Sequence, residues 1–251
     1  MLRALLLSCL LAASAAAQPL TTDRPDFTES PLAVDAGRIQ VELGATFQAF
    51  DFQGERTVFN TPEALVRVGV ARGVELRTVL PEYTRVVREA DALAPRIVTE
   101  DATDPSVGLK VELGNASGVD LGVIAETTVP VVESEFDVDR SVQTVIVTAA
   151  GDLSPRLSLG SQLSATYNET PDRVGLGATV VLGLSLDDQI GLFAELAASD
   201  PVDVAIDAEV LLHGGATLLL TDDLQLDAHA ALGLTDTAPE YLVGVGASAR
   251  F

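Results

Sequence analysis

The sequence predicts an all-β fold: a transmembrane, antiparallel, up-and-down β-barrel of about twelve strands, preceded by a signal peptide. Hydrophobic and polar residues alternate with a period of two along most of the chain. The alternating segments are longer than the strands of ordinary globular proteins. Short and long connections alternate between them, as they do in barrels that span the outer membrane.

Composition limits the classes of protein that remain. The 251 residues are 47% hydrophobic, yet the net charge is -22. A mean hydropathy of +0.32 is too high for a disordered acidic chain. Its apolar surface must therefore be buried or face lipid. A pI near 4.2, with no basic stripe, argues against a nucleic-acid partner.

Residues 1–17 read MLRALLLSCLLAASAAA, with one arginine, an apolar run and small residues at the end. This order is typical of a secretory signal peptide cleaved after Ala17. The single cysteine, Cys9, lies inside it, so the mature chain has neither a disulfide nor a thiolate metal site. Residues 18–37 then form an N-terminal periplasmic or plug segment, and residues 38–251 form the outer-membrane barrel.

The final strand shows the alternation clearly. Tyr241, Val243, Val245, Ala247, Ala249 and Phe251 share one face, and glycine, serine and arginine share the other. Most such segments span roughly 10–13 residues, which suits a tilted bilayer crossing. The same template predicts strands near 38–50, 61–71, 73–83, 105–114, 119–130, 140–151, 156–167, 173–184, 189–198, 204–220, 224–234 and 240–251.

Two further features bear on the barrel. The Gly214-Gly215 pair leaves two interpretations of the tenth segment, one long strand or a short hairpin, and the second would change the strand count. With an even count, both termini lie in the periplasm, where the short turns are.

Aromatic residues stand at the predicted outer ends of strands, as in an aromatic girdle: Phe50, Phe52, Tyr83, Tyr167 and Tyr241.

The polar faces of the predicted strands carry charges that would project into the lumen. Two interpretations fit them: ion pairs that close the interior, or a lining for a solute path. Lumen-facing glycines such as Gly44 and Gly244 leave room inside or allow curvature. The candidate residues are Arg38, Glu42, Arg67, Glu75, Arg77, Lys110, Glu112, Glu126, Asp227, His229 and Arg250.

A charged, proline-containing motif precedes the first strand. It comprises Asp23, Arg24, Pro25, Asp26, Phe27, Thr28, Glu29, Ser30 and Pro31. One interpretation places it in the lumen as a plug or gate whose charges pair with the wall. The other makes it a periplasmic tether used during assembly.

This motif, together with the Gly37-Arg38-Ile39-Gln40-Val41-Glu42-Leu43-Gly44 stretch, resembles the family described as "Putative MetA-pathway of phenol degradation". The resemblance implies a transporter-like barrel in a Gram-negative outer membrane, with hydrophobic or aromatic compounds as its solutes. Phe251 resembles the terminal aromatic signal that the barrel-assembly machinery recognises. The expected partners are therefore outer-membrane lipid, that machinery and a small solute.

The predicted function is passive or facilitated passage of small solutes. A filled structural or adhesion-type barrel that binds a partner through its loops is the alternative, and a secreted soluble β-sandwich is the third. We predict no enzyme, cofactor or metal site. The two histidines, His213 and His229, have no nucleophile elbow beside them. The acidic loops at 100–104 and 133–139 lack the spacing of a calcium loop.

Overall fold

A computed structural model describes residues 20–51, 55–90, 95–132, 141–169, 172–200 and 207–251. Within these ranges every regular element is a β-strand. No helix there is long and apolar enough to cross a membrane. The predicted signal peptide, Phe52, the acidic loop at 133–139 and the start of the predicted strand at 204 lie outside the described residues.

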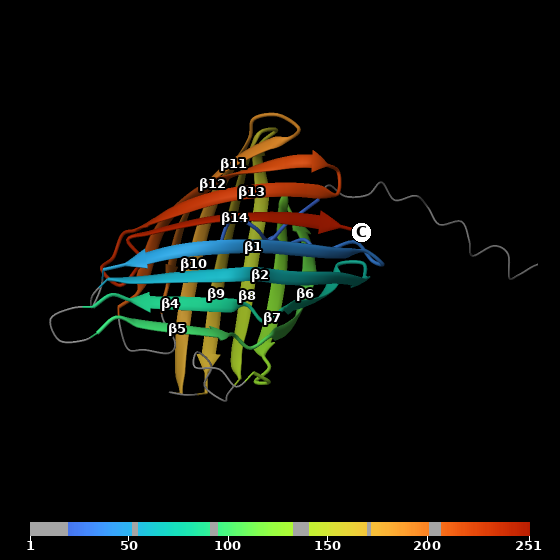
Figure 1. Ribbon diagram of the computed structural model, residues 1–251. Helices are drawn as coiled ribbons and strands as arrows, with labels where there is room; N and C mark the ends of the chain where they lie inside the picture. The colour runs from blue at the N-terminus through green and yellow to red at the C-terminus, as the bar shows by residue number, and fades with distance from the viewer. Residues whose placement is uncertain (1–19, 52–54, 91–94, 133–140, 170–171, 201–206) are drawn as a thin grey trace, which may run out of the picture.

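The strands form one antiparallel sheet that closes on itself, because β1 pairs with both β14 and β2 (Figure 1). Closure leaves no free edge between the first and last strands, which is what lets a sheet sit in lipid. The strands are β1 (Ile39–Phe50), β2 (Arg56–Ala71), β3 (Val74–Val79), β4 (Tyr83–Arg88), β5 (Ile97–Ala102), β6 (Ser106–Ala116), β7 (Val119–Thr128), β8 (Val142–Ser154), β9 (Leu157–Asn168), β10 (Arg173–Ser185), β11 (Ile190–Ser199), β12 (Glu209–Thr221), β13 (Leu224–Gly233) and β14 (Tyr241–Arg250).

These strands make twelve spans, as predicted, because two spans are each broken once. β2 is long enough to pair with β3 near one end and with β4 near the other. β3 and β4 are thus consecutive parts of one span, and β5 and β6 are parts of the next. Pro81 and Pro105 stand at the two breaks, where a residue without an N–H cannot continue the ladder.

Two details of the predicted boundaries are wrong. The strand predicted at 73–83 is interrupted after Val79, and the region treated as a loop at 84–104 contains the β4–β5 hairpin. That hairpin extends the wall from the outer part of β2 (Figure 1). The Gly214-Gly215 ambiguity is settled in favour of a single strand, because β12 pairs through both glycines with β11 and β13.

The barrel has two distinct ends. Short turns follow β2, β6, β8, β10 and β12, and we call this the short-turn end. Ile39 and Phe251 meet there through two backbone hydrogen bonds of 3.2 and 2.8 Å. The N-terminal end of β1 and the C-terminal end of β14 therefore both lie at the short-turn end. The opposite, long-loop end carries the longer connections (Figure 1).

Apolar side chains cover the outside of the barrel and charged ones fill the inside. Val145, Val147 and Leu163 point outward and are 48–66% exposed, whereas Arg67 and Lys110 point inward with no exposed surface. A soluble sandwich would bury its apolar face instead, so this distribution requires lipid around the wall. Tyr83 and Tyr241 face outward, but Phe50 faces inward and is buried, so it is not part of a girdle.

Candidate functional site: the barrel lumen and its N-terminal segment

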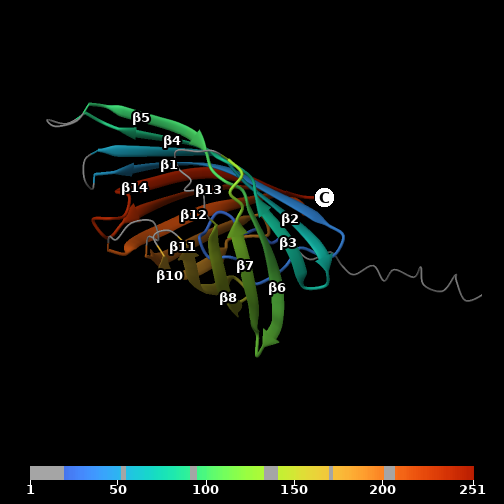
Figure 2. The same cartoon turned by 90° about the horizontal axis from the view of Figure 1, so that it is seen from below.

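Residues 20–36, which we call the N-terminal segment, run through the interior of the barrel (Figure 2, blue loop). The segment has no regular secondary structure, so its backbone groups need partners from the wall. Hydrogen bonds join it to side chains of β1, β2, β3, β6, β8, β9, β10, β11 and β13. A segment bonded to so many strands lies across the lumen rather than along one side.

Asp23 is the centre of the contact between segment and wall. Both of its carboxylate oxygens lie 2.7 Å from Nζ of Lys110. One oxygen also lies 3.2 Å from Arg67 and 3.2 Å from Arg77. All four residues are buried. A charge removed from water is tolerated only when it is paired and hydrogen-bonded, so the segment and wall charges depend on each other.

The wall charges continue this network. Arg67 binds Glu42 and Glu75, each at 2.9 Å. Arg77 binds Glu29 of the segment at 2.9 Å and Glu126 at 2.5 Å. Six predicted lumen residues therefore meet in one cluster: Glu42, Glu75, Arg67, Arg77, Lys110 and Glu126.

Wall carboxylates also accept hydrogen bonds from the backbone of the segment. Glu42 accepts from the amide of Asp23 at 3.0 Å, Glu75 from that of Val34 at 2.9 Å, and Glu112 from that of Ala33 at 2.8 Å. The predicted residue Glu112 thus contacts the segment apart from the main cluster. These bonds give partners to backbone N–H groups that no secondary structure satisfies inside the barrel.

Arg38 and Arg250 lie elsewhere, at the short-turn end. Their guanidinium groups bind Asp223 of the β12–β13 turn at 3.0 and 2.8 Å. The hydrogen bond from Arg250, with the nearby positive charges, lowers the pKa of Asp223 below its ordinary value of 3.8. These two predicted residues therefore hold a turn at the rim and do not join the central cluster.

Arg24 reaches the wall on the other side of the segment. It binds Glu63 at 2.7 Å and Asp227 at 3.4 Å. Its guanidinium lies over Gly44 and Gly246, which are directly opposite each other on β1 and β14. A Cβ atom at either glycine would overlap the guanidinium. The lumen glycines here make room for the segment, a role that the sequence did not reveal.

Glu195 is the main wall residue that the sequence analysis missed. It accepts hydrogen bonds from the amide of Phe27 at 2.9 Å and from the hydroxyl of Thr28 at 2.6 Å. His213 Nδ1 lies 2.8 Å from the same carboxylate, and the ring of Phe27 lies 4.4 Å from that of His213. Glu195 is the one acid in the strand predicted at 189–198, and this position on the polar face could have identified it as a lumen residue.

The predicted lumen residue His229 extends this group. Its Nδ1 lies 2.9 Å from Nε2 of His213, so Glu195, His213 and His229 form a hydrogen-bonded row. His213 bonds through both of its ring nitrogens, whereas Nε2 of His229 lies over Gly244 and is buried without a hydrogen-bond partner in the described part of the chain. His229 also lines a cavity.

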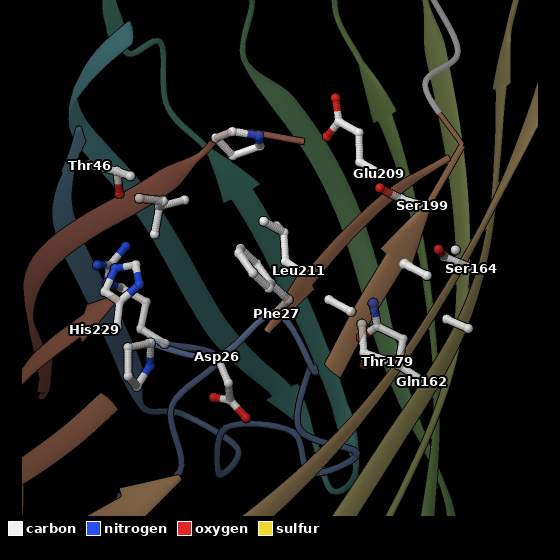
Figure 3. A pocket seen from close by; sticks show the side chains of 18 of the residues that line it. Asp26, Phe27, Thr46, Gln162, Ser164, Thr179, Ser199, Glu209, Leu211 and His229 are labelled. Atoms are coloured by element: carbon white, nitrogen blue, oxygen red, sulfur yellow. The ribbon is translucent and has the colours of Figure 1, made fainter. Parts of the chain in front are cut away.

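The cavity, of about 480 Å³, lies between the segment and the wall (Figure 3). Phe27 lies in its middle, with His229 on one side and Thr179 and Gln162 on the other. Asp26 and Glu209 add carboxylates to its lining. Mixed apolar and polar linings on this scale are typical of sites that hold small molecules.

Residues 22–251 match the model of the family described as "Putative MetA-pathway of phenol degradation". The chain belongs to this family. The match begins inside the N-terminal segment and runs to the last residue, so the phenol-degradation family model includes both the segment and the barrel. No curated protein matches the chain.

Solved structures support the fold of this family member. A COG4313 outer membrane channel from Pseudomonas putida F1 shares 14% identity and a TM-score of 0.63, with 92% of this chain and 100% of that chain covered. The KdgM porin shares 9% identity and a TM-score of 0.55, with 84% and 99% covered. The NanC porin shares 7% identity and a TM-score of 0.55, with 83% and 98% covered.

Proposed function

We propose that this protein is an outer-membrane channel for small solutes, and that its N-terminal segment occludes the lumen. The main observation that supports this proposal is the buried ion cluster that joins Asp23 to Lys110, Arg67 and Arg77 inside a closed barrel. It holds the segment across the path that a solute would take. Similarity in fold to an outer membrane channel and to two porins supports passage, rather than catalysis, as the role.

The orientation follows from the two ends of the barrel. In outer-membrane barrels short turns face the periplasm and long loops face outward. We therefore assign the short-turn end, with both ends of the barrel domain, to the periplasm. Phe251 then stands at the periplasmic edge, where it would be read as the assembly signal. The N-terminal segment would enter the lumen from the periplasmic side.

The solute class is the next part of the proposal. The family description refers to phenol degradation, which favours hydrophobic or aromatic compounds. Phe27 in the cavity offers one aromatic surface to such a compound, and the threonine and glutamine side chains around it offer hydrogen bonds. A solute of that kind would pass only when the segment moves away from the wall or leaves a gap beside it.

Single-channel conductance in a planar bilayer tests the proposal. The refolded mature protein is compared with a variant that lacks residues 18–36, and heat-modifiable migration on a gel checks that both have folded. We expect a larger conductance after deletion, because the deletion removes the segment from the lumen.

Equal conductance in both proteins would support the channel function and refute occlusion of the lumen by the segment. No conductance from either folded protein would refute the channel. That result would favour the second candidate, a filled structural barrel, which the fully paired ion cluster also fits.

A further inference from the structure

One carboxylate of the N-terminal segment has no cation beside it. Asp26 is half-buried and lines the cavity, where Figure 3 shows it below Phe27. It forms no ion pair with any described residue, whereas Asp23 and Glu29 of the same segment each bind cations of the wall. The charge of Asp26 is therefore not compensated by the side chains that compensate its neighbours.

The charges that act most strongly on Asp26 are negative. They belong to Glu195, Asp23 and Glu29. An ionised carboxylate that is partly removed from solvent and surrounded by other carboxylates is destabilised. A bound cation would remove this destabilisation, so the surroundings of Asp26 favour a positively charged ligand.

The other charged side chains of the lining do not supply a cation to Asp26. Arg24 is the only arginine or lysine among the described residues that line the cavity, and it binds Glu63 at 2.7 Å and Asp227 at 3.4 Å. Glu209 adds a further carboxylate to the lining. The described part of the lining thus carries more carboxylates than cations.

The rest of the lining suits an apolar body. The ring of Phe27 lies in the middle of the cavity, and Leu211 and Leu242 add aliphatic side chains. An aromatic face attracts a cation as well as an apolar group. No group of three histidine, cysteine, aspartate or glutamate side chains in the described ranges could hold a metal ion. The cavity therefore fits an ammonium group on an apolar body better than it fits a metal ion.

The cavity lies on the long-loop side of the ion cluster. β1 runs from the short-turn end to the long-loop end, and Glu42 of the cluster comes before Thr46 and Gln48 of the cavity. Ser199 and Glu209, at the long-loop ends of β11 and β12, also line the cavity. A solute that enters between the long loops reaches the cavity before it reaches the ion cluster.

We propose that Asp26 binds the ammonium group of a small amine whose apolar body packs on Phe27 and Leu211. A protonated amine donates charge-assisted hydrogen bonds to the carboxylate. The site fills from the long-loop side while the segment remains docked. This proposal rests on the channel function proposed above, because it names the class of solute that the channel takes.

Equilibrium dialysis of the mature, detergent-solubilised protein with labelled benzylamine, which is protonated at neutral pH, tests the site. Benzyl alcohol, which has the same ring but no charge, is the control ligand. We expect benzylamine binding to weaken at least about tenfold in Asp26→Asn, which is the loss of a charge-assisted hydrogen bond. Asp51→Asn is the matched control, because Asp51 is an exposed carboxylate at the long-loop end that does not line the cavity. Heat-modifiable migration on a gel checks that both variants have folded.

Several results would overturn the proposal. They are the absence of benzylamine binding to the wild-type protein, unchanged binding in Asp26→Asn, equal losses in Asp26→Asn and Asp51→Asn, or equal binding of benzyl alcohol. Displacement of benzylamine by an equal concentration of potassium would also overturn it, because the site would then hold any cation. The dialysis needs no membrane, so a failure to bind benzylamine leaves the channel function standing, whereas a folded protein without conductance refutes the channel.

Discussion

Asp23 and Lys110 are joined by two hydrogen bonds, one from Nζ to each carboxylate oxygen, both 2.7 Å long. Asp23 belongs to the N-terminal segment and Lys110 to the middle of β6, 87 residues later in the chain. Both side chains are almost completely buried. Since neither ion is exposed to solvent, each depends on the other, and the contact fixes the position of the segment in the barrel.

Substitution Asp23→Asn should release the segment. It removes the carboxylate that lies 2.7 Å from Lys110 and leaves that lysine with Glu29 at 3.7 Å, whereas Arg67 and Arg77 keep their other carboxylates. Removing one partner of a buried ion pair costs about 3–5 kcal/mol. The barrel wall keeps its ladder hydrogen bonds, so we expect the segment to undock while the barrel stays folded. Single-channel conductance should then rise toward that of the deletion variant. Asp152→Asn, which changes an exposed carboxylate, is the control, and a wild-type conductance in Asp23→Asn would contradict the prediction.

Substitution Gly44→Ala should displace Arg24. The new methyl group overlaps the end of the Arg24 side chain, which is flexible and can swing away. We expect normal folding on a heat-modifiability gel but a higher conductance, because the contact of Arg24 with Asp227 is lost. Gly183→Ala is the matched control, since its methyl group meets only the hydroxyl of Ser158. An equal change in both variants would mean that any added methyl group in the wall has this effect.

Substitution Glu195→Gln should loosen the middle of the segment. Glu195 accepts bonds from the Phe27 amide, the Thr28 hydroxyl and His213, and an amide group has one oxygen fewer to accept them. A buried donor left unsatisfied costs about 1–3 kcal/mol. Hydrogen exchange at the Phe27 amide should accelerate by roughly tenfold or more. Exchange should stay unchanged in Glu240→Gln, which alters an exposed loop carboxylate.

The rim of the barrel should weaken in acid through Asp223. Its pKa is lowered in the folded protein, chiefly by the hydrogen bond from Arg250. A lowered pKa means that the carboxylate stabilises the fold above its ordinary value of 3.8 and that this contribution disappears as the pH falls below it. The difference in thermal stability between wild type and Asp223→Asn should therefore be present at pH 7 and shrink below about pH 4. A difference that does not change with pH would refute this account.

Much of the barrel could be predicted because its determinants are local. Alternation places Val145 outside and Thr148 inside whatever the neighbouring strands are, since side chains of a strand point to opposite faces. Strand length and loop length are also read directly along the chain. The interruption after Val79 and the β4–β5 hairpin were missed because residues 84–104 were assigned to a long loop, and only pairing with β2 shows that Tyr83–Arg88 continues the wall.

The sequence predicted which residues face the lumen, but it did not predict which of them contact one another. The polar faces identified Arg67, Arg77 and Lys110 as lumen residues, and the motif before the first strand identified Asp23. Nothing in the sequence determined that these four side chains meet, since they come from the N-terminal segment and three different strands.

The sequence by itself determined that the chain alternates, that its apolar face needs lipid and that its charges point inward, because each property depends on neighbours along the chain. Only the tertiary structure decided that Glu195 holds Phe27 and that Gly44 and Gly246 leave room for Arg24. Closure of the barrel brings residues far apart in the chain within hydrogen-bonding distance. The burial of their charges then makes each pairing specific, because a buried charge without a partner loses its hydration and gains nothing in return.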